Sequence, residues 1–335
     1  MRYLSVCSGI EAATVAWHPL GWEPVAFSEV DAFPSAVLAH HYPTVPNWGD
    51  MTKFQEWPDA DVDLLVGGTP CQSFSVAGLR AGLDDPRGSL LLTYLAIARR
   101  YRPRWVVWEN VPGVLSADEG RAFGSLLGGL GELGYGFAYR VLDAQYFGLA
   151  QRRKRVFVVG HLGDWRRAAA VLFERESLSG HPAPRREAGQ VAPTVPARRS
   201  GGGGLRTDFD CDGGLIAHSL RADGFDASED GTGRGTPLVP CAFDAMQSDV
   251  ITYGDQSGPL DTDGHSIAVA QRMAVRRLTP RECERLMGLP DDYTLIPYRG
   301  KPATDGPRYK SLGNSMAIPV VRWIGRRIQM VDELA

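Results

Sequence analysis

The chain has 335 residues, of which 44% are hydrophobic and 22% are charged, with a formal net charge of −3. These values are typical of a soluble globular protein large enough for one large domain and a smaller one. No stretch is long and apolar enough to cross a membrane, and the first residues are typical of a strand rather than a signal peptide. We therefore expect a cytoplasmic protein.

The cysteines and the charged residues narrow the possible functions further. The five cysteines are widely spaced and form no CxxC pair, so neither a zinc knuckle nor a disulfide framework is indicated. Basic residues cluster at 99–104, 151–155 and 272–285, whereas residues 205–265 hold 12 acidic side chains and 3 arginines. Each basic cluster alone is more often a solvated surface, but three of them beside one cleft would favour a nucleic-acid partner.

Strand and helix signals alternate through residues 1–160. Strands are predicted at 2–8, 24–29, 62–68 and 104–110, and a hairpin at 137–144 and 154–160. Helices are predicted at 11–20, 32–42, 89–101 and 121–134. This alternation predicts an α/β fold with a doubly wound, mostly parallel sheet, whose ligands bind at the carboxyl ends of the strands. The residues at such ends include Gly9, Glu29, Cys71 and Glu109.

Residues 161–270 are rich in Gly, Asp, Ser and Pro, and predict a small β-rich domain with long loops or a partly disordered segment. Regular structure returns at Thr279, which together with Pro280 and Glu282 predicts a capped helix start. The last segment predicts an amphipathic helix that must return to a core. We expect a first domain at 1–160, a second at 161–285, and a C-terminal segment at 286–335 that returns to the first domain.

The turn after the first strand, VCSGIEAA at residues 6–13, lies where α/β proteins bind nucleotides. A dinucleotide site would need G-x-G-x-x-G, but only Gly9 is present, and Glu11 would repel a phosphate. The pattern favours an adenosine cofactor without phosphates, with Glu29 on the ribose hydroxyls and Asp50 on the adenine amino group. Taken singly, either of these two acids is more often a helix cap or a surface residue.

Three further stretches carry candidate catalytic residues. The loop GGTPCQSFS places Cys71 behind a stiffening proline, as a nucleophile would be, although a single cysteine is more often structural. Glu109 leaves the apolar strand VVWEN, where burial would raise the pKa of a proton donor; the alternative is a carboxylate satisfied by backbone amides. In QRRKRVF, strand alternation puts Gln151, Arg153 and Arg155 on one face, which favours a charged ligand, a held carboxylate or a basic hairpin edge.

These blocks, in this order, resemble the DNA cytosine-5 methyltransferase family. CSGIEA is similar to its first cofactor motif, GGTPCQSFS to its nucleophile motif, and VAGLRAGLDDPRGSL to its mobile catalytic loop. ENVPGVL is similar to its glutamate motif, QRRKRVF to its arginine motif, and RRLTPRECERLMGLP and SLGNSMAIPV to its ninth and tenth motifs. The resemblance covers residues 1–160 and 272–325. It departs from the family at Cys7, where an aromatic residue is usual, and at Glu11, where a glycine is usual.

The resemblance implies a Rossmann-like S-adenosylmethionine-dependent methyltransferase fold, with a smaller target-recognition domain rich in strands and loops. It implies that Cys71 attacks C6 of a flipped cytosine and that Glu109 protonates N3. Arg153 and Arg155 would hold the base and orient Glu109, and C5 would take the methyl group from S-adenosylmethionine without a metal. The implied cofactor-binding residues are Cys7, Ser8, Gly9, Ile10, Glu29, Val30, Asp50, Met51, Gly68, Pro70, Asn314 and Ser315. The implied DNA-binding residues are Gln72, Ser75, Val76, Ala77, Arg80, Arg87 and Gln151.

The implied partner is double-stranded DNA, methylated at a specific sequence, and the expected product of the cofactor is S-adenosylhomocysteine. We expect a monomer in a bacterial cell or a phage-infected host, with or without a companion restriction endonuclease. Two alternatives stay open: an RNA (tRNA) cytosine-5 methyltransferase, and a non-catalytic DNA-binding regulator on the same fold. The missing glycines disfavour an NAD-dependent oxidoreductase.

Overall fold

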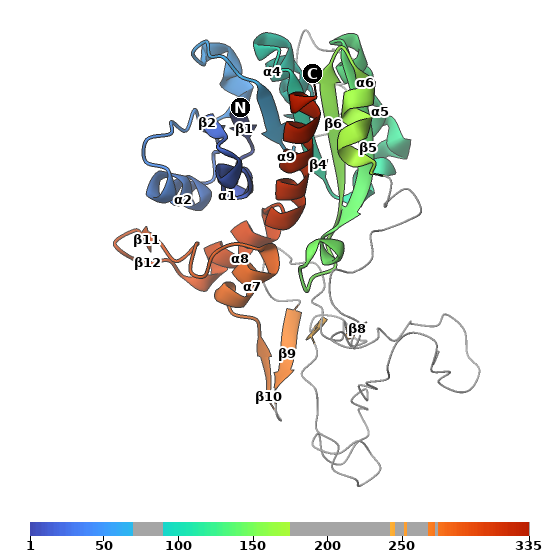
Figure 1. Cartoon of the computed structure of the whole chain (residues 1–335). Coiled ribbons are helices and arrows are strands. Elements are labelled where there is room, and N and C mark those ends of the chain that lie inside the picture. The colour runs from blue at the N-terminus through green and yellow to red at the C-terminus, as the bar shows by residue number, and fades with distance from the viewer. Residues whose placement is uncertain (70–89, 175–241, 245–250, 253–266, 272–273, 335) are drawn as a thin grey trace, which may run out of the picture.

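The computed structural model describes residues 1–69, 90–174, 242–244, 251–252, 267–271 and 274–334 (Figure 1). A six-stranded sheet in the order β2-β1-β3-β4-β6-β5 forms its centre. The strands are β1 (Arg2–Val6), β2 (Glu23–Ser28), β3 (Leu64–Gly67), β4 (Trp105–Asn110), β5 (Tyr135–Asp143) and β6 (Lys154–Leu162). The first four pair in parallel, whereas β6 pairs antiparallel with both β4 and β5. This confirms the predicted mixed, mostly parallel sheet.

Helices cover both faces of the sheet, because its strands carry apolar side chains on both faces. One face packs against α1 (Ala12–Trp17), α2 (Ala32–His41), α6 (Trp165–Leu172) and α9 (Ile318–Glu333). The other packs against α4 (Leu90–Tyr101) and α5 (Arg121–Glu132). Short 3-10 helices lie in the connections: η1 (His18–Leu20), η2 (Met51–Glu56), η5 (Pro112–Leu115), η6 (Ala117–Gly120) and η7 (Ala144–Phe147). No helix in the described ranges has the length and apolarity needed to cross a membrane.

The C-terminal part begins with the capped helix that the sequence predicts, α7 (Pro280–Met287). The Glu282 carboxylate accepts from the Thr279 amide at 2.7 Å, and the Thr279 hydroxyl accepts from the Glu282 amide at 3.3 Å. The hairpin β11 (Pro297–Tyr298) and β12 (Lys301–Pro302) and the helix α8 (Asp305–Asn314) follow. A buried ion pair of 3.1 Å between Arg308 and Glu284 joins α8 to α7.

Four short strands lie in the segment for which the sequence predicts a β-rich domain. They are β7 (Ala242–Asp244), β8 (Ile251–Thr252), β9 (Ile267–Gln271) and β10 (Ala274–Arg277), and they pair in the order β10-β9-β7-β8. Figure 1 shows this second sheet below α7, apart from the six-stranded sheet.

Helix α9 lies between α1 and α6 on the first face of the sheet (Figure 1). The Trp17 indole of α1 donates from Nε1 to the Val321 carbonyl of α9 at 2.9 Å. Gly325 lies one turn further along α9, where an added Cβ would overlap the Trp17 ring. A glycine is therefore needed at this position for the last helix to dock on the first one.

We predict that Gly325→Ala lowers the free energy of unfolding by about 2 kcal/mol, because overpacking forces the Trp17 ring or the α9 backbone to move. Gly124→Ala in α5 is the matched control: its Cβ would meet nothing within 4 Å, so the variant should gain up to about 1 kcal/mol from helix propensity. Urea unfolding of both variants measures the effect. Equal stability of the two variants would contradict the packing of α9 on α1.

Candidate active site

Glu109 and Arg155 form an ion pair at the carboxyl end of β4. Glu109 Oε1 lies 3.2 Å from Arg155 Nε, and both side chains are largely buried. The register explains the contact: Glu109 lies opposite Phe157, and Arg155 is two residues from Phe157 on the same face of the sheet. Burial raises the pKa of Glu109, and the charges of Arg155 and then Arg153 oppose that rise. The site thus holds a carboxyl whose protonation is set by a balance between burial and two guanidiniums.

The residues that follow β3 pack against the same end of β4. A Cβ on Gly68 would lie 2.7 Å from the Glu109 carbonyl oxygen and 3.1 Å from Glu109 Oε2, so only glycine fits. The Thr69 carbonyl accepts from Asn110 Nδ2 at 2.7 Å, and the Thr69 hydroxyl accepts from Trp108 Nε1 at 3.2 Å. These bonds hold the last described residues before Cys71 beside Glu109.

Thr69 and Asn110 are anchors that the motifs did not predict, although each is a polar residue at the end of a strand. The predicted residues Pro70, Cys71, Gln72, Ser75, Val76, Ala77, Arg80 and Arg87 lie outside the described residues.

Arg153 is 2% exposed, and the described hydrogen bonds of its side chain go to the C-terminal segment rather than to Glu109. Its Nη2 donates to the Gly313 carbonyl at 2.8 Å and to the Ser315 carbonyl at 2.7 Å. Burial lowers the pKa of Arg153 to about 9, the Arg155 charge adds to this, and Glu109 opposes it. The base-holding role expected for Arg153 stays a prediction.

Gln151 is completely buried, two residues before Arg153. Its Nε2 donates to the Leu286 carbonyl of α7 at 3.2 Å. The alternation expected for this stretch is present, since Gln151 and Arg153 are buried while Arg152 and Lys154 are exposed. A DNA contact by the Gln151 side chain, which stays a prediction, would require α7 to move.

The turn between β1 and α1 is tied to the end of β2. The Ser8 amide donates to the Ser28 carbonyl at 3.1 Å, and the Gly9 amide donates to Glu29 Oε2 at 2.8 Å. Glu29 Oε1 accepts from the amides of Val30 and Asp31. A Cβ on Gly9 would meet no described residue within 4 Å, so the described part of the chain leaves the space beside this turn open. Ile10, the next residue, is buried in the core below it.

Cys7, Asp50 and Met51 lie beside the turn between β1 and α1. The Cys7 thiol donates to Met51 Sδ at 3.4 Å, and burial, with a smaller contribution from Glu29, raises the pKa of Cys7 to about 12. Asp50 Oδ1 caps η2 by accepting from the Thr52 amide and hydroxyl. The thiol is therefore a protonated packing group rather than a nucleophile.

The C-terminal segment reaches this turn as well. Lys310 of α8 lies 3.1 Å from Asp31, two residues after Glu29, and the Tyr293 hydroxyl donates to the Ile10 carbonyl at 3.0 Å. At the end of α8 the Asn314 side chain is exposed, whereas Ser315 is buried. Val30, directly after Glu29, is 68% exposed.

Glu11 has a role that the sequence analysis missed, because its side chain points into the protein. Its backbone is left-handed, with φ at 63°, and it caps α1. Oε1 accepts from the Thr14 amide and hydroxyl, and Oε2 accepts from the Ser5 hydroxyl at 2.8 Å. Burial raises the pKa of Glu11 to about 7, although these hydrogen bonds lower it. The expected repulsion of a ligand phosphate is therefore not its function here.

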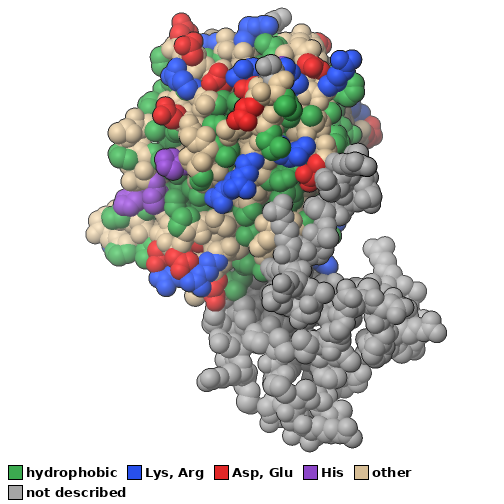
Figure 2. Space-filling view, in the orientation of Figure 1, with side chains coloured by type: hydrophobic (Ala, Val, Ile, Leu, Met, Phe, Trp, Pro, Cys, Tyr) green, Lys and Arg blue, Asp and Glu red, His purple; other side chains and the backbone are tan. Residues whose placement is uncertain are grey.

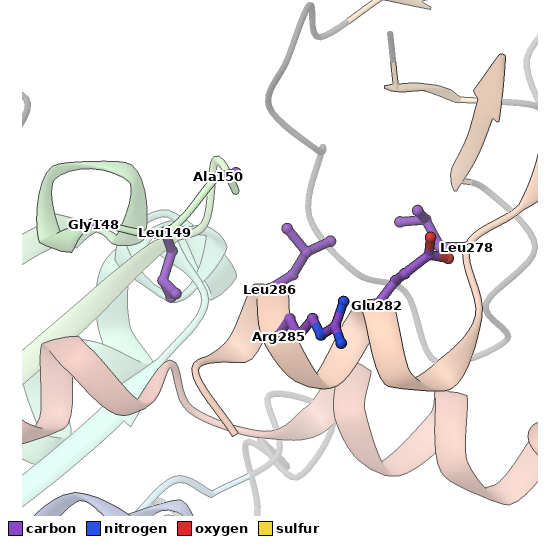
Figure 3. Close-up of a pocket in the computed structure, with 7 residues that line it drawn as sticks. All are labelled: Gly148, Leu149, Ala150, Leu278, Glu282, Arg285 and Leu286. Atoms are coloured by element: carbon purple, nitrogen blue, oxygen red, sulfur yellow. The ribbon is translucent and has the colours of Figure 1, made fainter. Parts of the chain in front are cut away.

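An open groove of about 410 Å³ separates the turn after η7 from α7 (Figure 3). It is lined by Gly148, Leu149, Ala150, Leu278, Glu282, Arg285 and Leu286. None of these is a predicted catalytic or cofactor residue, so we do not place the site there.

The arginines of α7 are held in ion pairs. Arg285 Nη2 lies 2.6 Å from Asp291, and Arg281 pairs with Asp292. Figure 2 shows basic and acidic side chains intermixed on the face in view. This part of the third basic cluster is therefore largely neutralised by its own neighbours. Within the described ranges, no group of three or more His, Cys, Asp or Glu is placed to hold a metal ion.

Comparison with known proteins places the chain in a family. Residues 1–192 and 230–330 match the family model of the C-5 cytosine-specific DNA methylases. The chain belongs to this family. Membership of this family implies the use of S-adenosylmethionine.

Three relatives show the range of the similarity. A protein of Escherichia phage P1 named DNA N-6-adenine-methyltransferase is 37% identical over 97% of this chain, which spans only 61% of that relative's length. Type II methyltransferase M1.ScrFI of Lactococcus lactis subsp. cremoris is 30% identical over 99% of this chain and 79% of the relative. The crystal structure of the S. pombe Dnmt2 methyltransferase, 17% identical, superimposes with a TM-score of 0.62 over 100% of this chain and 99% of that one, which supports the fold.

The raised pKa of Glu11 makes the stability of this DNA methylase family member depend on pH. The folded state binds the Glu11 proton more tightly than the unfolded state does, so this stabilisation is complete below the ordinary pKa of 4.5 and is lost as the pH rises through about 7. Between these values the wild type should lose about 3 kcal/mol relative to Glu11→Gln, in unfolding curves measured at several pH values.

Ser5→Ala is a second variant in that series, because it removes a hydrogen bond that lowers the pKa of Glu11. The loss of stability should then extend to higher pH than in the wild type. Parallel pH profiles for the wild type and Glu11→Gln would show that Glu11 is not the titrating group.

Gly68→Ala should push the end of β3 away from Glu109 and reduce methyl transfer by about 100-fold, because small displacements at a reacting centre have large kinetic effects. Gly306→Ala is the matched control, since an added Cβ there meets nothing within 4 Å. Transfer of labelled methyl groups to DNA, together with the melting temperature, measures the effect. Full activity in a folded Gly68→Ala variant would refute the close packing against Glu109.

Proposed function

We propose that the chain transfers a methyl group from S-adenosylmethionine to C5 of a flipped cytosine in double-stranded DNA, at a specific sequence. The observation that carries this proposal is the anchoring of Gly68 and Thr69 on the end of β4. It brings the start of the Cys71 loop next to the Glu109–Arg155 pair. A nucleophile and a buried proton donor are the two groups that addition to a cytosine ring requires.

In the proposed mechanism the Cys71 thiolate adds to C6 of cytosine, forming a C–S bond and moving electron density towards C5 and N3. Glu109 donates a hydrogen bond or a proton to N3 as the ring becomes electron-rich. Arg155 holds the Glu109 carboxyl in position through the 3.2 Å ion pair. After methylation a base removes the C5 proton, the C–S bond breaks, Cys71 leaves as the thiolate, and N3 returns any proton it received to Glu109. The target base must leave the duplex for these groups to reach it.

The residues at the ends of β1 and β2 suit an adenosine cofactor that carries no phosphate. The open space above Gly9, the Glu29 carboxylate and the exposed Val30 side chain offer a backbone surface, a hydroxyl acceptor and an apolar contact. Asp50 lies at the start of η2 and the Asn314 side chain is exposed at the end of α8. When bound there, S-adenosylmethionine supplies an electrophilic methyl group. Glu11 is turned inwards, so its departure from the family's usual glycine leaves this surface free.

The name of the phage P1 relative offers a second candidate, methylation of adenine at N6. Two observations favour cytosine: the family model matches most of this chain, and this chain spans only 61% of the phage protein. A proline-cysteine nucleophile motif has no use in methylation of an exocyclic amine, which is itself nucleophilic.

We propose that the strands β7 to β10 and their neighbourhood read the target sequence.

The test is to express the wild type and Cys71→Ser in cells that lack DNA methylation. Bisulfite sequencing maps 5-methylcytosine, and mass spectrometry of the nucleosides measures both 5-methylcytosine and N6-methyladenine. We expect sequence-specific 5-methylcytosine in the wild type and none with Cys71→Ser, because serine is a far weaker nucleophile than a thiolate.

Cys211→Ser is the matched control and should methylate as the wild type does. N6-methyladenine without 5-methylcytosine would establish the adenine reaction instead. If neither base is modified in DNA, methylation of tRNA is measured next, and its absence leaves the non-catalytic DNA-binding alternative.

A further inference from the structure

The stretch from Gln151 to Arg155 connects three separate parts of the molecule. Its buried side chains alternate along the chain, and each one binds a different element. Gln151 binds the α7 carbonyl of Leu286, Arg153 binds the C-terminal end of α8, and Arg155 binds Glu109 of β4. Arg153 lies in the middle of this row, between the candidate catalytic pair and the C-terminal segment.

The Arg153 guanidinium holds the two carbonyls that flank Asn314. Its Nη2 bonds Gly313 and Ser315 at 2.8 and 2.7 Å, and these carbonyls lie at the C-terminal end of α8. A cation is favourable there, because the last carbonyls of a helix lack intrahelical partners and carry partial negative charge. The two bonds fix the backbone on both sides of Asn314 and leave its side chain exposed.

The same guanidinium acts on Glu109. Its charge is one of the two that lower the pKa of the Glu109 carboxyl, the other being that of Arg155. Within the described part of the chain, Arg153 Nε and Nη1 have no hydrogen-bond partner although the residue is buried. The two carbonyls are therefore the anchors that determine where the Arg153 charge sits relative to Glu109.

We propose that Arg153 is a positioning residue that links the backbone around Asn314 to the Glu109 carboxyl, so that cofactor binding and base protonation depend on one another. The proposal rests on the proposed function, in which Asn314 and Ser315 contact the cofactor and Glu109 protonates the base. A shift of residues 313–315 moves the guanidinium, and the electrostatic field at Glu109 changes with it.

A residue that only stabilised the fold would lower the melting temperature and the amount of active protein. It would leave two properties of the folded fraction unchanged: the affinity for the cofactor product and the pH dependence of methyl transfer. The proposed link changes both properties. Arg153 Nη2 bonds the carbonyls of residues 313 and 315, and the charge of the same guanidinium acts on Glu109.

The experiment compares the full-length wild type with Arg153→Gln, Arg153→Lys, Arg155→Met and the exposed control Arg152→Met. Calorimetry measures the Kd for S-adenosylhomocysteine, and single-turnover methyl transfer to DNA is followed from pH 6 to about 10. Arg153→Gln should bind S-adenosylhomocysteine about tenfold more weakly, because it loses charge-assisted bonds to the segment. In the pH profile of methyl transfer by this variant, the fall in rate at high pH (the alkaline limb) should move to higher pH. The reason is that Glu109 loses a neighbouring positive charge, so the pKa of Glu109 rises.

Arg155→Met should show the same direction of pH shift with an unchanged Kd, since it does not touch residues 313–315. Arg153→Lys keeps the positive charge but loses the guanidinium bonds to the two carbonyls. The alkaline limb of its pH profile should therefore match that of the wild type, while its Kd for S-adenosylhomocysteine should be larger. Arg152→Met should match the wild type in both measurements. If Arg153→Gln does not fold, the Kd of Arg153→Lys for S-adenosylhomocysteine decides instead.

A folded Arg153→Gln with wild-type Kd and an unmoved alkaline limb would overturn the proposal. So would Arg153→Lys with wild-type Kd where the glutamine variant does not fold. Failure of the proposed function has a different signature, because the wild type would then neither bind S-adenosylhomocysteine nor methylate DNA.

Discussion

The antiparallel register between β4 and β6 is the constraint on which the candidate site depends. It sets Glu109 opposite Phe157 and so places Arg155 diagonally across from the carboxyl. A slip of one residue would turn Arg153 and Arg155 to the opposite face of the sheet. Buried cross-strand pairs resist such a slip. Val107 lies opposite Val159, and the ring centroids of Trp105 and His161 are 4.6 Å apart. An apolar core thus fixes the position of a charged pair.

Much of the fold follows from local patterns in the sequence. Apolar runs of strand length mark the six strands, and Gly9, Glu29 and Glu109 are predictable as site residues because they follow or end those runs. The capping box at Thr279 and the burial alternation from Gln151 to Arg155 are likewise encoded by neighbours a few residues apart. Such features are predictable because the residues that cause them lie close together in the chain.

Contacts between distant residues left no such signal. Arg153 reaches carbonyls 160 and 162 residues away, and its sequence neighbourhood does not reveal whether it faces a base, a carboxylate or a backbone. Helix α8 begins Asp-Gly-Pro, a run typical of a turn, although proline is well tolerated in the first turn of a helix. Glu11 adopts a left-handed backbone that few side chains favour, so its inward direction depends on the Ser5 and Thr14 bonds. The direction of Arg153 is decided by long-range packing, whereas the Glu11 and α8 features depend on local hydrogen bonds and turn geometry that the residue types alone did not reveal.

The charges around Glu109 explain why a buried site should hold two arginines and one carboxyl. Arg155 has a carboxylate partner, whereas Arg153 is held by carbonyl dipoles, so the cluster keeps one more positive than negative charge even when Glu109 is ionised. This excess opposes protonation of Glu109 in the resting site, against the effect of burial. In the proposed reaction a thiolate adds electron density to the cytosine ring, and the same excess then stabilises the developing negative charge. The excess positive charge therefore disfavours the proton on Glu109 at rest and stabilises the electron-rich cytosine ring, which must receive that proton.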